Sequence, residues 1–266
     1  MPAEVGISKA GTLFFSSLCA STFGLGTWQA KRYFEKIEQV EKREKELALP
    51  PIALERDAKC SIDEHGIRGH RPIVVSGKFR HEDEILVGPR GPPLGALAAS
   101  GPNSGRSSGG MSSSPQGFYC LTPFERSNNM GTVVVNRGWI PRSYIQQNAA
   151  WQRPTGKVTL VGVASKTEQP RFMSPPHSDI ESNQLLWFDR EAIEARTKTK
   201  GMEPLLMTET ISGSNTGADG PPFKPSKESV GEFKVTPATH FGYGLTWFGL
   251  SGAGIIMTRK LITRGR

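Results

Sequence analysis

Two long segments without charged side chains bracket the chain and dominate its hydrophobic pattern. Residues 10–30 carry no charge, and residues 237–258 contain His240 as their one ionisable group near neutral pH. A membrane-spanning helix needs about 20 consecutive, predominantly apolar residues. The pattern therefore predicts two transmembrane helices, at residues 7–30 and 237–258. The alternative interpretation is a signal peptide followed, much later, by a buried core helix.

Basic residues at the C-terminus indicate how such helices would be oriented. The tail, residues 259–266, contains Arg259, Lys260, Arg264 and Arg266 and no acidic residue. Basic flanks stay on the cytoplasmic or matrix side of a membrane. Both ends of the chain are therefore expected on that side, although the basic residues that directly follow the first segment oppose this orientation.

The residues between the two segments follow other patterns. Residues 31–49 are rich in charged helix formers and are expected to form a juxtamembrane helix, which a pair of prolines ends. Residues 52–236 hold short β-branched runs separated by turn residues, which predict strands, with Gly-, Ser- and Pro-rich loops at 91–116 and 212–229. The expected fold is an α+β membrane protein in which two transmembrane helices flank a mainly antiparallel β domain with minor helix.

Two short motifs in the β domain constrain its backbone. Gly77, in the run RPIVVSGKF, indicates a bend or a close approach of two backbones. In NRGWIPR, Gly138 allows a tight turn, and Arg137 and Arg142 offer guanidinium groups to a carboxylate. We interpret NRGWIPR as a structural turn, with a partner-docking loop as the alternative.

Composition and charge narrow the functional classes. The chain has 266 residues and a net charge of +8, but no basic cluster is interleaved with aromatic side chains, so we expect no nucleic-acid partner. Cys19, Cys60 and Cys120 lack the C-x-x-C spacing of zinc sites, and a Cys60–Cys120 disulfide stays open. The sequence contains no H-E-x-x-H metalloprotease motif. We expect that the protein is not an enzyme.

Seven motifs occur in the same order as in a known family. They are GLGTWQAKR, VSGKFRHEDEILVGPR, GFYCLTPFE, VNRGWIPR, LVGVASKTEQP, LLWFDREAI and THFGYGLTWFGL. In these motifs the chain resembles the surfeit-locus-1 family of cytochrome c oxidase assembly factors, from about Gly24 to the C-terminus apart from the loops at 91–116 and 212–229. The resemblance implies a chaperone of respiratory complex IV biogenesis in the mitochondrial inner membrane, with its β domain in the intermembrane space. In a prokaryote the location would be the bacterial cytoplasmic membrane.

The resemblance also implies partners and a cofactor. The partners would be the cytochrome c oxidase core subunit, other assembly factors and membrane lipid. The cofactor would be haem a, transiently bound and then delivered to, or inserted into, that core subunit. The alternative function is a haem-independent membrane scaffold that stabilises an oxidase assembly intermediate.

His240 is the position that the resemblance implies as the contact of haem a, with its imidazole as the ligand of the iron. The other candidate cofactor-binding residues lie near His240 or at the end of the first segment: Tyr243, Trp247, Trp28, Gln29 and Arg32. If the two segments are antiparallel neighbours, TWQAKR and THFGYG meet at the same end. The alternative for all six residues is an interfacial belt of aromatic side chains, histidine and snorkelling arginine.

Overall fold

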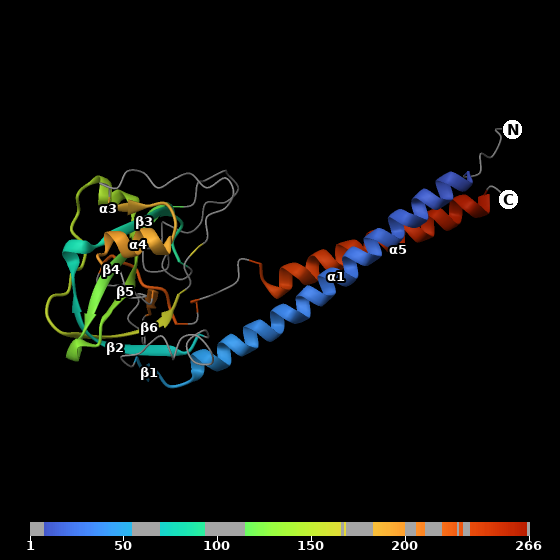
Figure 1. Cartoon of the computed structure of the whole chain (residues 1–266). Helices are drawn as coiled ribbons and strands as arrows, with labels where there is room; N and C mark the ends of the chain where they lie inside the picture. Colours follow the sequence, from blue (N-terminus) through green and yellow to red (C-terminus); the bar gives the residue numbers. More distant parts are fainter. Residues whose placement is uncertain are drawn as a thin grey trace. The chain divides into compact units, whose positions relative to one another are not determined.

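The computed structural model divides into two compact units (Figure 1). The described residues are 8–54, 70–93, 115–165, 168, 183–199, 206–210, 220–227, 229–230 and 235–264. One unit is formed by Met1–Arg43 and Phe233–Arg266, and the other by Glu44–Glu232. Cys60 and most of the two predicted loops, 91–116 and 212–229, lie outside the described residues.

The first unit is a pair of antiparallel helices, α1 and α5. Helix α1 runs over Lys9–Ala48 and α5 over Pro237–Arg264. No proline interrupts α1, and two prolines follow it, whereas Pro237 opens α5 at the position where a missing N–H costs nothing. Figure 1 shows the beginning of α1 beside the end of α5. Residues 9–30 and 31–48, which the sequence assigns to two separate segments, therefore belong to one continuous helix.

Small residues let α1 and α5 approach each other closely. A Cβ atom on Gly26 would lie 2.7 Å from the ring of Phe248, and one on Gly254 would lie 2.7 Å from Cys19 Sγ. The Ser251 hydroxyl donates a hydrogen bond of 3.0 Å to the Cys19 carbonyl. These contacts define the α1–α5 seam. Residues later in α1 contact residues earlier in α5, as in any antiparallel pair of helices.

The prediction of transmembrane helices is wrong. None of the helices in the described part of the chain combines the length and the apolar content that crossing a membrane requires. The two predicted spans, 7–30 and 237–258, hold many Ser, Thr, Ala and Gly residues where a spanning helix carries Leu, Ile, Val and Phe. Absence of charge was thus mistaken for hydrophobicity. The membrane-protein fold class and the multi-pass location are therefore not supported, while membrane lipid as a partner stays a prediction.

The second unit is built on one eight-stranded sheet. Its strands are β1 (Ile52–Ala53), β2 (Pro72–Phe79), β3 (Ile85–Arg90), β4 (Gly117–Arg126), β5 (Thr132–Pro141), β6 (Val158–Ala164), β7 (Gln184–Leu185) and β8 (Leu206–Glu209). The short helices are α3 (Arg142–Gln146), α4 (Arg190–Arg196), and the 3-10 helices η1 (His81–Asp83) and η3 (Ser127–Asn129). The β-rich character that the sequence predicts for this region therefore stands.

Five of the strands close into a hydrogen-bonded ring. Strand β2 pairs with β6, β6 with β8, β8 with β5, β5 with β4, and β4 again with β2. Most pairings are antiparallel, while β1–β2, β3–β7 and β5–β8 are parallel. Closure leaves these five strands without a free edge over the paired residues, and β3, β7 and β1 extend the sheet outside the ring.

Strand β5 is buried on both faces. Val133 and Val135 pack in one apolar cluster with Phe124 and Met207, while Val134 points into a second cluster on the opposite face. This explains the uninterrupted VVV run, since a strand covered on both sides does not alternate apolar and polar residues. Helix α4 covers the second cluster, and the carboxylate of its N-cap residue, Asp189, accepts a hydrogen bond from the Ala192 amide.

The NRGWIPR motif is a strand and not the turn that the sequence predicts. Its residues up to Pro141 lie in β5, and the register with β4 shifts between Cys120 and Leu121. Gly138 has a φ of +128° at this bulge, a conformation that residues with a Cβ atom rarely adopt. The glycine therefore serves a bulge within the strand.

Candidate functional site

Gln29 and His240 form the central contact between the ends predicted to meet. Gln29 Oε1 and His240 Nδ1 lie 2.8 Å apart. Gln29 is 8% exposed, and His240 is half-buried in the first turn of α5. The structure thus places TWQAKR and THFGYG side by side within the helical unit, while the cofactor role of these residues stays a prediction.

Gly26 and Gly244 lie where the backbones of α1 and α5 come close to each other beside this contact. A Cβ atom on Gly244 would lie 3.7 Å from Gln29 Cβ and 4.0 Å from the carbonyl oxygen of Gly26. The two helix backbones are therefore close at this level. This close approach lets the Gln29 amide reach the imidazole on the neighbouring helix.

The other four predicted residues are placed around this contact without joining it. Trp28 is 49% exposed and Tyr243 is 54% exposed, while Trp247 is half-buried. Arg32 Nη1 donates to Glu35 Oε2 at 2.9 Å, and its guanidinium carbon lies 5.9 Å from the centre of the Trp28 ring. Within the described residues, no hydrogen bond, ion pair or ring contact connects these four side chains to His240.

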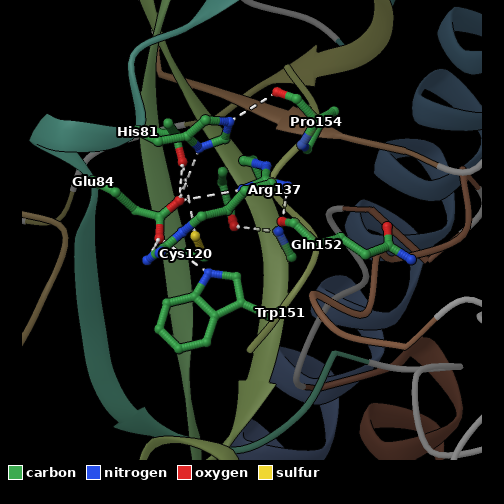
Figure 2. A network of polar contacts seen from close by, with 11 residues as sticks. His81, Glu84, Cys120, Arg137, Trp151, Gln152 and Pro154 are labelled. Atoms are coloured by element: carbon green, nitrogen blue, oxygen red, sulfur yellow. Dashed lines mark hydrogen bonds and ion pairs between the residues drawn. The ribbon is translucent and has the colours of Figure 1, made fainter. Parts of the chain in front are cut away.

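A second polar cluster lies in the β unit (Figure 2). Its centre is the carboxylate of Glu84, which follows η1 and is 4% exposed. Glu84 Oε2 accepts hydrogen bonds from Thr122 Oγ1 at 2.9 Å and Arg137 Nη1 at 3.2 Å. Glu84 Oε1 accepts from Trp151 Nε1 at 3.0 Å and Arg153 Nη2 at 3.1 Å. Both oxygens of the buried carboxylate are therefore satisfied.

The surroundings of Glu84 favour its ionised form. Burial acts to raise its pKa, but hydrogen bonds from Thr122 and Cys120 and the charges of Arg137 and Arg153 outweigh burial and hold the pKa below its ordinary value. Burial, and then the negative charge of Glu84, raise the pKa of the Cys120 thiol. The thiol therefore stays protonated and is unsuited to nucleophilic chemistry.

The same cluster fixes the connection between α3 and β6. Arg137 Nη2 donates to the carbonyl of Gln152 at 2.5 Å, and His81 Nε2 donates to the carbonyl of Pro154 at 2.9 Å. His81 Nδ1 faces Glu84 Oε2 at 3.6 Å. Because residues of the connection are held at two nearby points in this way, we interpret the cluster as a structural anchor. Arg137 binds a carboxylate, as its motif suggested.

The sequence offered little by which Glu84 could be found. Its hydrogen-bond partners lie between 38 and 69 residues further along the chain. A local pattern carries no information about contacts at that separation. The one signal in the sequence was Arg137, whose motif offered a guanidinium group to a carboxylate.

Metal binding by a preformed cluster finds no support in the described residues. Among them, no group of three or more His, Cys, Asp and Glu side chains is arranged to hold a metal ion. A haem iron differs from such an ion because the porphyrin supplies four of its ligands and the protein supplies one or two. A single histidine is therefore sufficient as the protein's ligand to a haem iron.

Comparison with known sequences defines the family. The sequence model of the SURF1 family matches residues 17–252, which include most of both helices of the first unit and the whole β unit. The chain belongs to the SURF1 family. The resemblance that the seven motifs indicated is thereby confirmed.

Relatives from several animals support membership of the SURF1 family. The chain is 30% identical to Surfeit locus protein 1 of Rattus norvegicus over 254 residues, which cover 94% of this chain and 76% of the rat protein. It is 32% identical to Surfeit locus protein 1 of Takifugu rubripes over 244 residues, covering 90% and 92% of the two chains. It is 30% identical to the SURF1-like protein of Drosophila melanogaster over 259 residues, covering 94% and 77%.

Proposed function

We propose that the chain acts as an assembly factor for cytochrome c oxidase, respiratory complex IV, in the mitochondrion. The observation that carries this proposal is the match of the SURF1 family model to residues 17–252. The match extends over both units, so it concerns the whole chain and not a single shared domain. The partners in this proposal are the catalytic core subunit of the oxidase and other assembly factors. The role is that of a chaperone and not of an enzyme.

The finer part of the proposal is that His240 offers its imidazole to haem a before the haem enters the core subunit. His240 Nδ1 is engaged by Gln29, so the second ring nitrogen is the one left to bind iron. A Cβ on Gly242 would meet no atom within 4 Å, and Tyr243 is exposed, so the surface next to His240 is open and partly aromatic. These residues fit a flat, largely apolar ligand. When bound, haem would bring an iron that takes a neutral imidazole as axial ligand.

The assembly role is tested in cells that lack their own member of the family. We expect this chain to restore cytochrome c oxidase activity and the amount of assembled complex IV on native gels. A chain that is stably present but leaves complex IV absent would contradict the proposal. Deleting residues 94–114 is a matched control, because this tract is Gly- and Ser-rich and we expect the shortened chain to restore assembly equally.

The haem role is tested separately, on purified protein from cells that make haem a. We expect a Soret band and an α band in the absorption spectrum of the wild type and a severalfold loss of both in His240→Ala. His81→Ala is the matched control, because His81 lies in the β unit and donates to a backbone carbonyl. If neither wild type nor His240→Ala contains haem while assembly still depends on the chain, the haem-independent scaffold is correct.

A further inference from the structure

We infer that Gln29 is a positioning residue that holds His240 in the tautomer protonated at Nδ1, leaving the free lone pair on Nε2. The geometry of the two side chains carries this inference. Its use in the cell rests on the proposed function, in which Nε2 is the ligand atom. The inference assigns Gln29 to the orientation of the imidazole and not to direct contact with a cofactor.

The hydrogen bond between His240 and Gln29 has a definite direction. Gln29 Oε1 lies 2.8 Å from His240 Nδ1, which is a good hydrogen-bond distance. Because the amide oxygen is the Gln29 atom that faces Nδ1, and an amide oxygen only accepts hydrogen bonds, we place the hydrogen on Nδ1. A neutral imidazole carries one hydrogen on its two nitrogens. Nε2 therefore bears the lone pair whenever His240 is neutral.

The two side chains of this hydrogen bond are firmly held. Gln29 is 8% exposed, so its amide is largely removed from competing water. Aromatic pairs flank the contact along the seam: Phe23 and Phe248 have ring centres 5.5 Å apart, and Tyr33 and Phe241 have ring centres 5.7 Å apart. Ring packing within about one turn on one side of the contact and about two turns on the other restricts the relative movement of α1 and α5 at this level.

The hydrogen bond to Gln29 prepares the His240 imidazole to bind a metal ion through its other nitrogen. A histidine that binds a metal through one nitrogen commonly donates its other N–H to an acceptor, which fixes the tautomer and the ring orientation. In the helical unit Gln29 provides that acceptor from the neighbouring helix. His240 is therefore prepared as a Lewis base before any ligand arrives, and less reorganisation is needed on binding.

The test reads the tautomer directly and needs no haem. The full-length protein is labelled with ¹⁵N-histidine, and the resonances of His240 are identified by their loss in His240→Asn. Protonated and unprotonated ring nitrogens resonate far apart, so spectra at alkaline pH show which nitrogen carries the hydrogen. We expect Nδ1–H in the wild type and in Gln29→Glu, whose carboxylate also accepts. We expect Gln29→Met, of similar length without an acceptor, to shift toward Nε2–H.

A matched control and a binding measurement complete the experiment. Gln39→Met makes the same change on the same helix, where the amide of Gln39 accepts from Lys36. We expect it to leave the His240 tautomer unchanged. Ferric haem b then serves as the probe, and we expect Gln29→Met to weaken its binding by about 10- to 100-fold, with Gln39→Met unaffected. Circular dichroism checks that each variant keeps its helices.

The outcomes separate this inference from the proposed function. An Nε2–H wild type, or the same tautomer in Gln29→Met as in the wild type, would overturn the positioning role. Equal haem affinity in Gln29→Met and the wild type would overturn it as a determinant of ligation. A tautomer change in a chain that binds no haem would sustain the positioning role and remove the haem proposal.

Discussion

Gly77 lies where strand β2 pairs with two neighbours at once. It is opposite Val158 of β6 and Arg126 of β4, so it stands at the corner where the ring closes. A Cβ atom added there would lie 2.0 Å from the carbonyl oxygen of Glu125. The atoms in the way belong to the backbone of β4, which cannot move aside without breaking ladder hydrogen bonds. This position therefore admits no side chain.

We expect Gly77→Ala to destabilise the β unit by about 1–3 kcal/mol or more, and Gly77→Glu to prevent accumulation of folded protein. The measurements are urea unfolding for Gly77→Ala and steady-state abundance for Gly77→Glu. Gly91→Ala is the matched control, because a Cβ on Gly91 would meet nothing within 4 Å. Wild-type stability in Gly77→Ala would disprove the close approach.

Glu84 is the second residue on which the β unit depends. We expect Glu84→Gln to lower the free energy of unfolding by about 3–5 kcal/mol at neutral pH, because Arg137 would stay buried without its counter-charge. Tryptophan fluorescence during urea unfolding measures this loss. In the control Glu125→Gln, the side chain is 56% exposed, and we expect a loss of about 1 kcal/mol or less.

The stabilisation of the fold by Glu84 depends on pH and is larger at neutral than at acidic pH. Its pKa is lower in the folded chain than the ordinary value of 4.5, so ionised Glu84 stabilises the fold fully above that value. The stabilisation is lost as the pH falls through the folded-state pKa. We therefore expect the stability difference between wild type and Glu84→Gln to shrink on acidification below about pH 4.5. A constant difference across that range would contradict the ionised state of Glu84.

Some of these residues could be predicted from the sequence and others could not. Gly77 was recognisable because a glycine inside a β-branched run marks a bend, a bulge or a close backbone approach. His240 was recognisable as an ionisable group in an uncharged segment. Its hydrogen bond to Gln29 required knowing that two helices run antiparallel in one particular register, which pairwise spacing along a single chain does not contain. Glu84 could not be found for the same reason.

At the scale of elements, the α1–α5 seam depends on the small residues that face each other. We expect Gly26→Leu to force the ring of Phe248 aside and to separate the helices near Gln29, because the added Cβ alone would come within 2.7 Å of that ring. Cysteines introduced at Tyr33 and Phe241, whose rings lie 5.7 Å apart, report the separation through their rate of oxidative cross-linking.

We expect this cross-linking to slow severalfold in Gly26→Leu. Gly24→Leu, two residues away, is the control, since a Cβ at Gly24 would meet nothing within 4 Å. Adding Phe248→Ala to Gly26→Leu should restore the rate by making room for the new side chain. Equal cross-linking in Gly26→Leu and Gly24→Leu would show that the seam does not require a glycine at that position.

The elements themselves were partly predictable. Long uncharged or helix-forming runs indicated α1 and α5, and β-branched runs indicated β2, β5 and β6. The class of the helices was misjudged because Gly, Ser and Thr are neutral in a count of charges yet add little hydrophobicity. The strand at NRGWIPR was mistaken for a turn because a glycine at a bulge has the same local sequence as a glycine in a turn.

At the scale of the whole molecule, the division into two units has a direct experimental consequence. We expect residues 44–232 to fold without the helix pair, because their contacts are concentrated within that unit. Thermal unfolding of this fragment should be cooperative. The control fragment, residues 44–205, lacks β8 and leaves the ring open between β5 and β6. A fragment 44–232 without cooperative unfolding would show that the β unit needs the helices.

The ring of strands also sets an order of events during synthesis. Strand β8 is the last to leave the ribosome or an import channel, yet it is the strand that joins β5 to β6. Until residue 209 has emerged, β5 and β6 of a nascent β unit each have an edge whose amide and carbonyl groups lack hydrogen-bond partners. Each newly made chain therefore passes through an interval in which it is open to misassembly, and the length of that interval is set by the residues that separate β6 from β8.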